Sequence, residues 1–71
     1  MNRDFVESSM IRSMGYDSIT GTVEVEFKSD SQIWQYYDVP ENTYSEVRYA
    51  GSIGGAFHRL IRNQFRSVRI G

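Results

Sequence analysis

The sequence contains no cysteine, one proline, one histidine and no long apolar run. Without cysteine the chain has neither a disulfide framework nor a thiolate metal site, and a reducing compartment, the cytoplasm, is the expected location. No stretch approaches the roughly 20 apolar residues that a membrane span requires. The amino terminus, Met1 to Glu7, also lacks the apolar run of a secretory signal. We therefore expect a protein that is neither embedded in a membrane nor secreted by that route.

Acidic residues are missing from the second part of the chain. All nine Asp and Glu lie in residues 1–46 with three Lys and Arg, which gives 3 − 9 = −6, whereas residues 47–71 hold five arginines, or +5. The overall charge of −1 conceals this division. Because Coulomb attraction depends on local charge, the basic segment favours a partner that bears phosphates. The pattern indicates a binding module and identifies no reaction.

The chain is short but rich in rings. At 71 residues it fits one small domain, residues 1–71, with a thin core. Aromatic residues make up 14% of the sequence, and large rings supply the buried area that offsets the cost of ordering the chain. We expect the chain to fold.

Three segments have strand patterns. Residues 22–28 alternate polar and apolar side chains, which is the period of a strand with one buried face. The segments before and after it are separated from it by Asp, Ser and Gly residues that suit turns. We predict an antiparallel meander with strands at about 8–16, 22–29 and 32–38.

Pairing across the two turns assigns the faces of this sheet, because opposite residues in an antiparallel ladder point the same way. We pair Tyr16 with Thr22, and Ser29 with Gln32. The core face then holds Ile11, Val23, Val25, Phe27, Trp34 and Tyr36. The outer face holds Met10, Arg12, Met14, Glu24, Glu26, Ile33, Gln35 and Tyr37, and it is unusually apolar for a solvated face.

Two helices are predicted after the strands. Asp38, Pro40 and Glu41 are typical of a helix start, and Gly51 suits a left-handed helix end, which predicts a helix over 40–50. Ser52 can cap a second helix over 53–66. A helical projection continued to residue 69 places four arginines within a wedge of about 80°, opposite the apolar side: Arg59, Arg62, Arg66 and Arg69. The predicted fold class is α+β, a β-β-β-α-α chain whose helices cover one face of the sheet.

A series of short motifs runs from about Val6 to Phe65. It comprises Ser8-Ser9, Gly15-Tyr16-Asp17, Gly21 to Phe27, Tyr36, Val39-Pro40, Ala50, Ser52, Gly54, Phe57 and Ile61-Arg62. The combination resembles the KTSC domain, a family named for its occurrence at the carboxyl end of some lysyl-tRNA synthetases. The family also occurs as short free-standing proteins in bacteria and their phages. The resemblance implies a small α+β fold and permits a link to RNA, and it assigns no activity.

The sequence departs from the family pattern in two places. His58 stands where an amide is expected, and the tail from Arg66 to Gly71 replaces an aromatic-proline ending. The outer end of the arginine stripe is therefore not inherited from the family.

The arginine stripe is the candidate nucleic-acid site. Arginine suits a phosphate backbone because its planar fork donates two parallel hydrogen bonds to one phosphate. The alternative is that the same pattern marks the solvated side of an amphipathic terminal helix, of which pairing with front-part carboxylates is one version. RNA or tRNA is the partner that the first interpretation predicts.

A second candidate site is the start of the second helix. Ser52, Gly54 and Gly55 would present backbone N–H groups to an anion such as phosphate. The alternative is a sharp turn between two helices, where glycines permit close approach to the sheet.

The outer sheet face offers a third candidate, a protein interface. Met10, Met14, Ile33 and Tyr37 fit a contact with another protein, or a homodimer formed through sheet faces, better than a nucleic-acid contact. Glu24 and Glu26 on the same face would repel phosphates.

Catalysis finds little support in the sequence. His58 falls at the margin of the apolar side of its predicted helix, which favours a structural hydrogen bond over acid–base chemistry. The serines lack an identifiable base and an orienting acid. Glu24 and Glu26 have a spacing that could face a metal, but alternating solvent-facing glutamates explain it. We predict a protein that is not an enzyme and needs no cofactor or metal.

Overall fold

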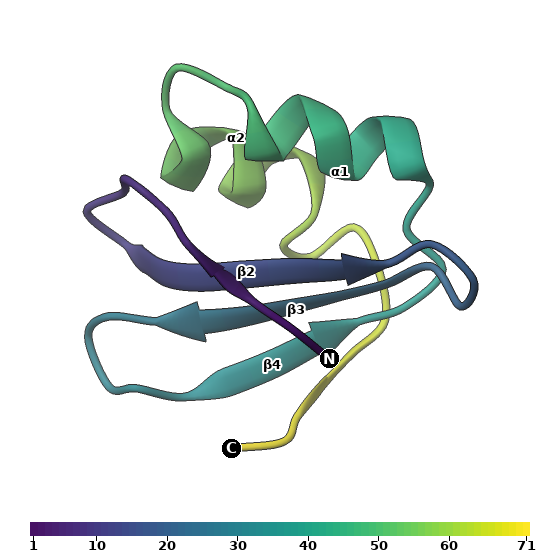
Figure 1. Ribbon diagram of the computed structural model, residues 1–71, viewed down its shortest axis with the longest axis horizontal. Helices are drawn as coiled ribbons and strands as arrows, with labels where there is room; N and C mark the ends of the chain where they lie inside the picture. The colour runs from purple at the N-terminus through teal and green to yellow at the C-terminus, as the bar shows by residue number, and fades with distance from the viewer.

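A computed structural model describes residues 1–71 and shows a sheet with two helices on one face (Figure 1). All strands are antiparallel and lie in chain order. They are β1 (Asp4–Phe5), β2 (Ile11–Asp17), β3 (Thr22–Phe27), β4 (Ile33–Tyr36) and β5 (Ser67–Arg69), with α1 (Glu41–Arg48) and α2 (Ile53–Leu60) between β4 and β5. The α+β class and the two helices are confirmed. The three-stranded sheet is wrong in detail, because the sheet has five strands.

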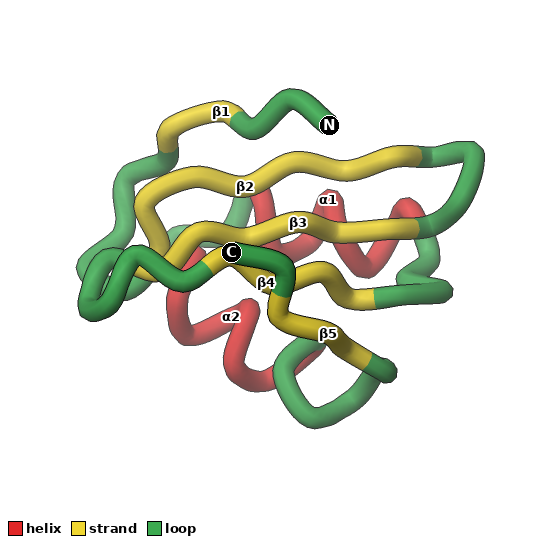
Figure 2. Tube along the Cα trace, turned by 90° about the horizontal axis from the view of Figure 1, so that it is seen from below, coloured by secondary structure: helices red, strands yellow, loops and turns green.

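The two additional strands come from the two ends of the chain. Seen from the side opposite the helices, β1 and β5 lie at opposite edges of the sheet (Figure 2). β1 pairs with β2 and β5 pairs with β4, so each end protects an edge that the meander would leave open. Neither short segment has a pattern long enough to predict a strand by itself.

The register between β2 and β3 differs from the predicted one by one residue. Tyr16 lies opposite Val23, and an irregularity between Ile11 and Ser13 restores the expected pair of Ile11 with Phe27. A shift of one residue turns every side chain to the other face. Met14 is therefore in the core with no exposed surface, and Tyr16 faces α1, where its ring stacks on Tyr44 at 4.8 Å.

The register between β3 and β4 differs by two residues, which preserves the faces. Trp34 lies opposite Val25 and Tyr36 opposite Val23. Because the side chains of a strand repeat every two residues, both rings still face the helices as predicted.

The first helix begins and ends without the predicted caps. Pro40 is its N-cap and no side chain bonds to the first turn. Asp38 is instead in the left-handed region with φ 58°, where it belongs to the turn that leads away from β4. The helix ends at Tyr49, where the Tyr49 N–H donates to the Ser45 carbonyl and the Ala50 N–H to the Val47 carbonyl, and Gly51 has no positive φ. Tyr49 is therefore the C-cap of α1, and the left-handed glycine end predicted at Gly51 is wrong.

The second helix is shorter than predicted. Ser52 caps it as expected, but it ends at Leu60 and not at residue 66. The N–H groups of Ile61 and Arg62 both donate to the carbonyl of Phe57, and Asn63 takes a left-handed φ of 67°. This tight turn redirects the chain so that residues 67–69 pair with β4.

The core lies between the helices and the covered sheet face. Phe57 of α2 is fully buried and contacts Phe27 and Tyr36 edge to face, with ring centroids 5.7 and 5.2 Å away. The remaining buried apolar residues surround it: Ile11, Met14, Val23, Val25, Val39, Val47, Ile53, Ala56 and Ile61. No helix has the length and apolar character of a membrane-spanning segment.

Candidate functional site

The four candidate arginines lie on three different parts of the structure. Arg59 is in α2, Arg62 is in the turn that follows, Arg66 precedes β5, and Arg69 is in β5. The helical stripe predicted for them is wrong, because the helix ends at Leu60. All four residues are nevertheless exposed.

None of these four guanidinium groups pairs with a carboxylate. The one ion pair of the protein joins Arg3 to Glu24, far from the carboxyl-terminal segment in sequence. The Arg66 guanidinium lies over the Tyr37 ring at 5.2 Å from its centroid, and Arg69 Nε donates to the Gly71 carbonyl at 2.7 Å. Pairing of these arginines with front-part carboxylates is therefore not found, while their exposure is compatible with a plain solvated surface.

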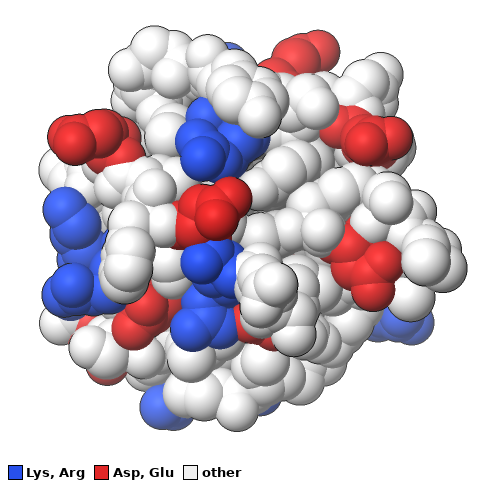
Figure 3. Space-filling view, viewed as in Figure 1, with Lys and Arg blue, Asp and Glu red and all other residues white.

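On the face of the molecule seen in Figure 1, folding mixes the charges that the sequence separates. In the view of Figure 1, acidic and basic side chains are interspersed and no wide area carries a single sign (Figure 3). A partner approaching this face meets both signs within a short distance. On this face the charge that a partner meets is therefore set by individual groups and not by the division of charge along the sequence.

A groove next to Arg62 is a candidate that the sequence analysis missed. It has a volume of about 210 Å³ and is lined by Met10, Phe27, Ser29, Asp30, Gln32, Trp34 and Arg62; we call it the Trp34 groove. Trp34 was placed in the core, and it does face the helices, but it is only partly buried. The strand pattern does not show whether a ring such as Trp34 lies at the centre of the core or at its margin. It also does not place Arg62 beside that ring, because the position of Arg62 depends on the turn after α2.

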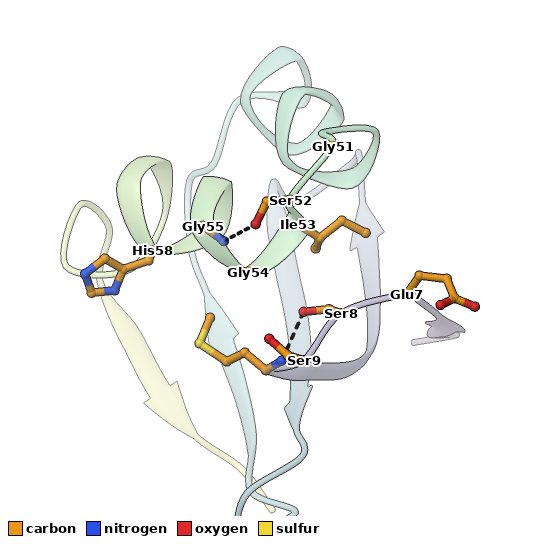
Figure 4. A pocket seen from close by; sticks show the side chains of 10 residues that line it. Glu7, Ser8, Ser9, Gly51, Ser52, Ile53, Gly54, Gly55 and His58 are labelled. Carbon is orange, nitrogen blue, oxygen red and sulfur yellow. Dashed lines mark hydrogen bonds between the residues drawn. The ribbon is translucent and has the colours of Figure 1, made fainter.

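The helix start proposed as an anion site borders a larger pocket of about 500 Å³ (Figure 4). Ser52 Oγ accepts from the Gly55 N–H at 3.2 Å, as a capping serine does. Ser8 approaches from the opposite wall, and its Oγ accepts from the N–H groups of Met10 and Ile11. Gly54 faces this wall, since an added Cβ would lie 3.3 Å from Ser8 Oγ. Glycine at this position therefore permits the close approach of α2 to the loop before β2.

The lining of that pocket does not favour an anion. It contains the carboxylate of Glu7 and no Lys or Arg, and the His58 ring points away from the two serines (Figure 4). A helix N-terminus alone attracts an anion weakly compared with a site that also provides a cation. The anion site at Ser52, Gly54 and Gly55 stays a prediction.

The four residues predicted as a protein interface do not form one surface. Met14 is fully buried, and Met10 lies beside α2 at Gly54, on the covered side of the sheet. Ile33 lies against Gly71 of the tail, and Tyr37 lies beneath Arg66. The one-residue shift in register and the tail strand together remove the apolar outer face on which this prediction depended.

Polar side chains occupy the outer face instead. Glu24 is only 5% exposed, yet its Oε1 accepts from Gln35 Nε2 at 2.8 Å and its Oε2 from Arg3. Arg3 Nε also donates to Ser13 Oγ at 3.0 Å, and Ser13 donates to Glu26 at 3.1 Å. A buried carboxylate is tolerated only when it is paired and hydrogen-bonded, and this network supplies both. Glu24 and Glu26 are therefore structural residues that fasten the amino-terminal segment to the sheet.

The rings that join the helices to the sheet have perturbed acidities. Burial raises the pKa of Tyr16, and the nearby Glu41 and Asp17 carboxylates raise it further. Burial also raises the pKa of Tyr36 and Tyr44, while the positive charges of Arg62 and Arg48, respectively, act in the opposite direction. A raised pKa keeps these hydroxyls in their neutral, hydrogen-bonding form near neutral pH.

The architecture defines a small α+β domain in which an antiparallel sheet carries two short helices on one face. The KTSC domain family matches residues 7–65, and the chain belongs to this family. The match ends before β5, so the family region includes Arg59 and Arg62 but neither Arg66 nor Arg69.

Relatives of two kinds support this assignment. A lysine–tRNA ligase of Nostoc sp. (strain PCC 7120) is 38% identical over 60 residues, which are 84% of this chain and 10% of that protein. An uncharacterized protein of Stutzerimonas stutzeri (strain A1501) is 35% identical over 71 residues and is covered to 99%. The chain thus spans about a tenth of the ligases it matches and nearly all of the small relative.

A solved structure has the same fold. The crystal structure of a KTSC domain protein from Yersinia pestis superimposes with a TM-score of 0.93 at 34% identity, and the match covers 99% of this chain and 97% of that one. The similarity extends over both ends of the chain, including the regions of β1 and β5.

Proposed function

We propose that this protein is a small non-catalytic module that contacts the phosphate backbone of RNA, with tRNA as the first candidate, through Arg59, Arg62, Arg66 and Arg69. The observation that carries the proposal is that all four residues are exposed while no carboxylate neutralises any of them. An unpaired surface guanidinium keeps its donors available for a phosphate.

The family relationship supports the choice of RNA. Relatives named lysine–tRNA ligase contain a segment similar to this chain, and a domain carried by such a protein works close to tRNA. The distribution of the arginines agrees with a weak contact. They are spread over a helix, a turn and a strand, so each would contact a separate phosphate and none would share a phosphate with another. Phosphate contacts of this kind position a nucleic acid without reading its sequence.

Salt dependence is the first test of the proposal. Each phosphate contact releases bound counterions, so four contacts predict that the logarithm of the association constant falls by about 3 for each tenfold rise in salt. Fluorescence anisotropy of labelled tRNA, titrated with the protein at several salt concentrations, measures this slope.

Charge reversal with a matched control is the second part of the test. The double variant Arg62→Glu, Arg66→Glu should lose most of the binding at low salt. The control, Arg12→Glu with Lys28→Glu, reverses two exposed cations of the front part and changes the net charge equally. Equal affinities of the two double variants for tRNA would overturn the assignment to these arginines.

A further inference from the structure

The Trp34 groove provides flat aromatic surface beside a free cation. Trp34 and Phe27 are partly buried, so part of each ring remains accessible at the groove. Trp34 Nε1 donates to Gln32 Oε1 at 3.1 Å, and Phe27 contacts Phe57 edge to face. These contacts fix the two rings before any ligand arrives, which lowers the entropic cost of stacking on them.

One arginine lines the groove, and a second belongs to the strand that pairs with Trp34. Arg62 lines the groove, is exposed and pairs with no carboxylate. Arg69 lies directly opposite Trp34 in the β4–β5 ladder. Because opposite residues of an antiparallel pair share a face, Arg69 is on the same side of the sheet as the Trp34 ring. An aromatic platform flanked by cations is the arrangement with which proteins hold single-stranded nucleic acid.

The size of the groove and its acidic group limit which kinds of ligand can bind there. At about 210 Å³ it is smaller than the roughly 300–1,000 Å³ of pockets for drug-sized ligands, so it suits one ring system. Asp30 is also in the lining, and its Oδ1 accepts from the Gln32 N–H at 3.1 Å. A carboxylate repels phosphate but accepts from the exocyclic amine of a base such as cytosine. The base is thus directed into the groove and the phosphate toward Arg62.

We infer that the Trp34 groove takes one unpaired base of single-stranded RNA, stacked on Trp34, with Arg62 and Arg69 contacting the adjoining phosphates. The inference rests on the proposed RNA function and adds to it that the chain prefers single strands to duplexes. A base inside a duplex is already stacked on both faces and cannot enter the groove.

The protein contains its own reporter for this contact, since Trp34 is the only tryptophan. Titration with a short single-stranded oligocytidylate should quench Trp34 fluorescence. A labelled RNA duplex of the same length should bind by anisotropy through the arginines and leave the Trp34 fluorescence unchanged. Arg62→Ala should weaken the binding of both RNAs.

Two variants separate stacking from folding. Trp34→Ala should weaken the binding of the single strand by roughly 5- to 100-fold, as expected for the loss of one base–aromatic stack, and spare the duplex. Because Trp34→Ala also removes packing at the core, the second variant is Ser29→Phe, which fills the groove from an exposed position and keeps Trp34. It should abolish the quenching and leave the binding of the duplex intact.

The outcomes distinguish this inference from the proposed function. If the single strand and the duplex bind equally and Trp34 fluorescence does not change, the groove is not a base site, while the backbone proposal stands. If neither RNA binds at low salt, both the groove inference and the proposed function are overturned. Quenching that persists unchanged in Ser29→Phe would also overturn the inference.

Discussion

Gly15 allows the amino-terminal segment to lie directly against strand β2. A Cβ at this position would lie 2.1 Å from the carbonyl oxygen of Asn2, which is much shorter than any non-bonded contact that a Cβ atom makes. The close approach matters because it delivers Arg3 to the buried carboxylate of Glu24. One missing side chain in β2 therefore decides whether the polar network of the outer face can form.

Gly15→Ala tests this dependence. We expect a loss of about 1–3 kcal/mol in the free energy of unfolding, because the backbone of Asn2 must move and Glu24 loses part of its pairing. Urea denaturation measures the loss. Gly51→Ala is the matched control, since no atom lies within 4 Å of its added Cβ and its φ is not positive. Its stability should stay within about 1 kcal/mol of the wild type, and equal stabilities of the two variants would contradict this account.

Individual side chains were predictable where a strand pattern was regular. Val23 and Val25 are fully buried, as their alternation with polar residues indicates. Met14 was assigned to the wrong face because a single irregularity between Ile11 and Ser13 changes the pairing of all later residues in β2. Such an irregularity has no signature in a short sequence, since it depends on how two strands fit each other.

The carboxyl-terminal segment shows how an element depends on its surroundings. Residues 61–69 continue the apolar and basic periodicity of a helix, yet the helix ends at Leu60 and the tail becomes β5. Ile61 is fully buried at the turn, and Ile33 of β4 exchanges backbone hydrogen bonds with Ile70 and Gly71. As a strand, the tail forms backbone hydrogen bonds with the open edge of β4. As a continued helix it would extend beyond the sheet and leave that edge unpaired.

Deletion of residues 67–71 should reveal the contribution of this strand. The truncated protein loses its pairing with Trp34, Gln35 and Tyr36 and exposes the edge of β4. We expect a loss of about 1–3 kcal/mol in the free energy of unfolding, since the lost hydrogen bonds are partly offset by the freedom that the tail regains. We also expect association that increases with concentration, measured by sedimentation.

The control for this deletion keeps the backbone of the tail. Val68→Ser with Ile70→Ser changes two half-exposed apolar side chains and preserves the β4–β5 hydrogen bonds. This variant should remain monomeric at every concentration at which the deletion associates. A deletion variant as stable and as monomeric as the control would show that β5 is dispensable.

For the whole molecule, tyrosines hold the helical layer on the sheet. Tyr16 stacks on Tyr44 of α1 and donates to the Val39 carbonyl at 2.6 Å, while Tyr36 contacts Phe57 of α2. The pKa of each of these three hydroxyls is raised, mainly by burial. The folded protein therefore binds their protons more tightly than the unfolded chain does.

This difference predicts the alkaline behaviour of the protein. Below the ordinary tyrosine pKa of 10.0 both states keep these protons, so the three groups add no pH dependence. Above it the unfolded chain loses protons first, and the free energy of unfolding falls as pH rises, by at most about 1.4 kcal/mol per pH unit for Tyr36. Urea denaturation followed by circular dichroism from neutral pH to beyond pH 10 measures the slope.

Tyr36→Phe supplies the comparison for this prediction. It removes one titrating hydroxyl, keeps the ring that contacts Phe57, and should make the decline above pH 10 shallower. A free energy of unfolding that rises with pH in this range, or an identical slope in wild type and variant, would contradict the prediction.

By itself, the sequence determined what depends on neighbours along the chain. The regular alternation in residues 22–27, the Ser52 cap, the order of the three central strands and the two helices, and the family pattern from about Val6 to Phe65 were all readable. Only the tertiary structure decided the two edge strands β1 and β5, the burial of Met14 and the places of the four arginines. Strand register and the end of α2 are set by hydrogen bonds between residues far apart in sequence, and local patterns carry no record of those partners.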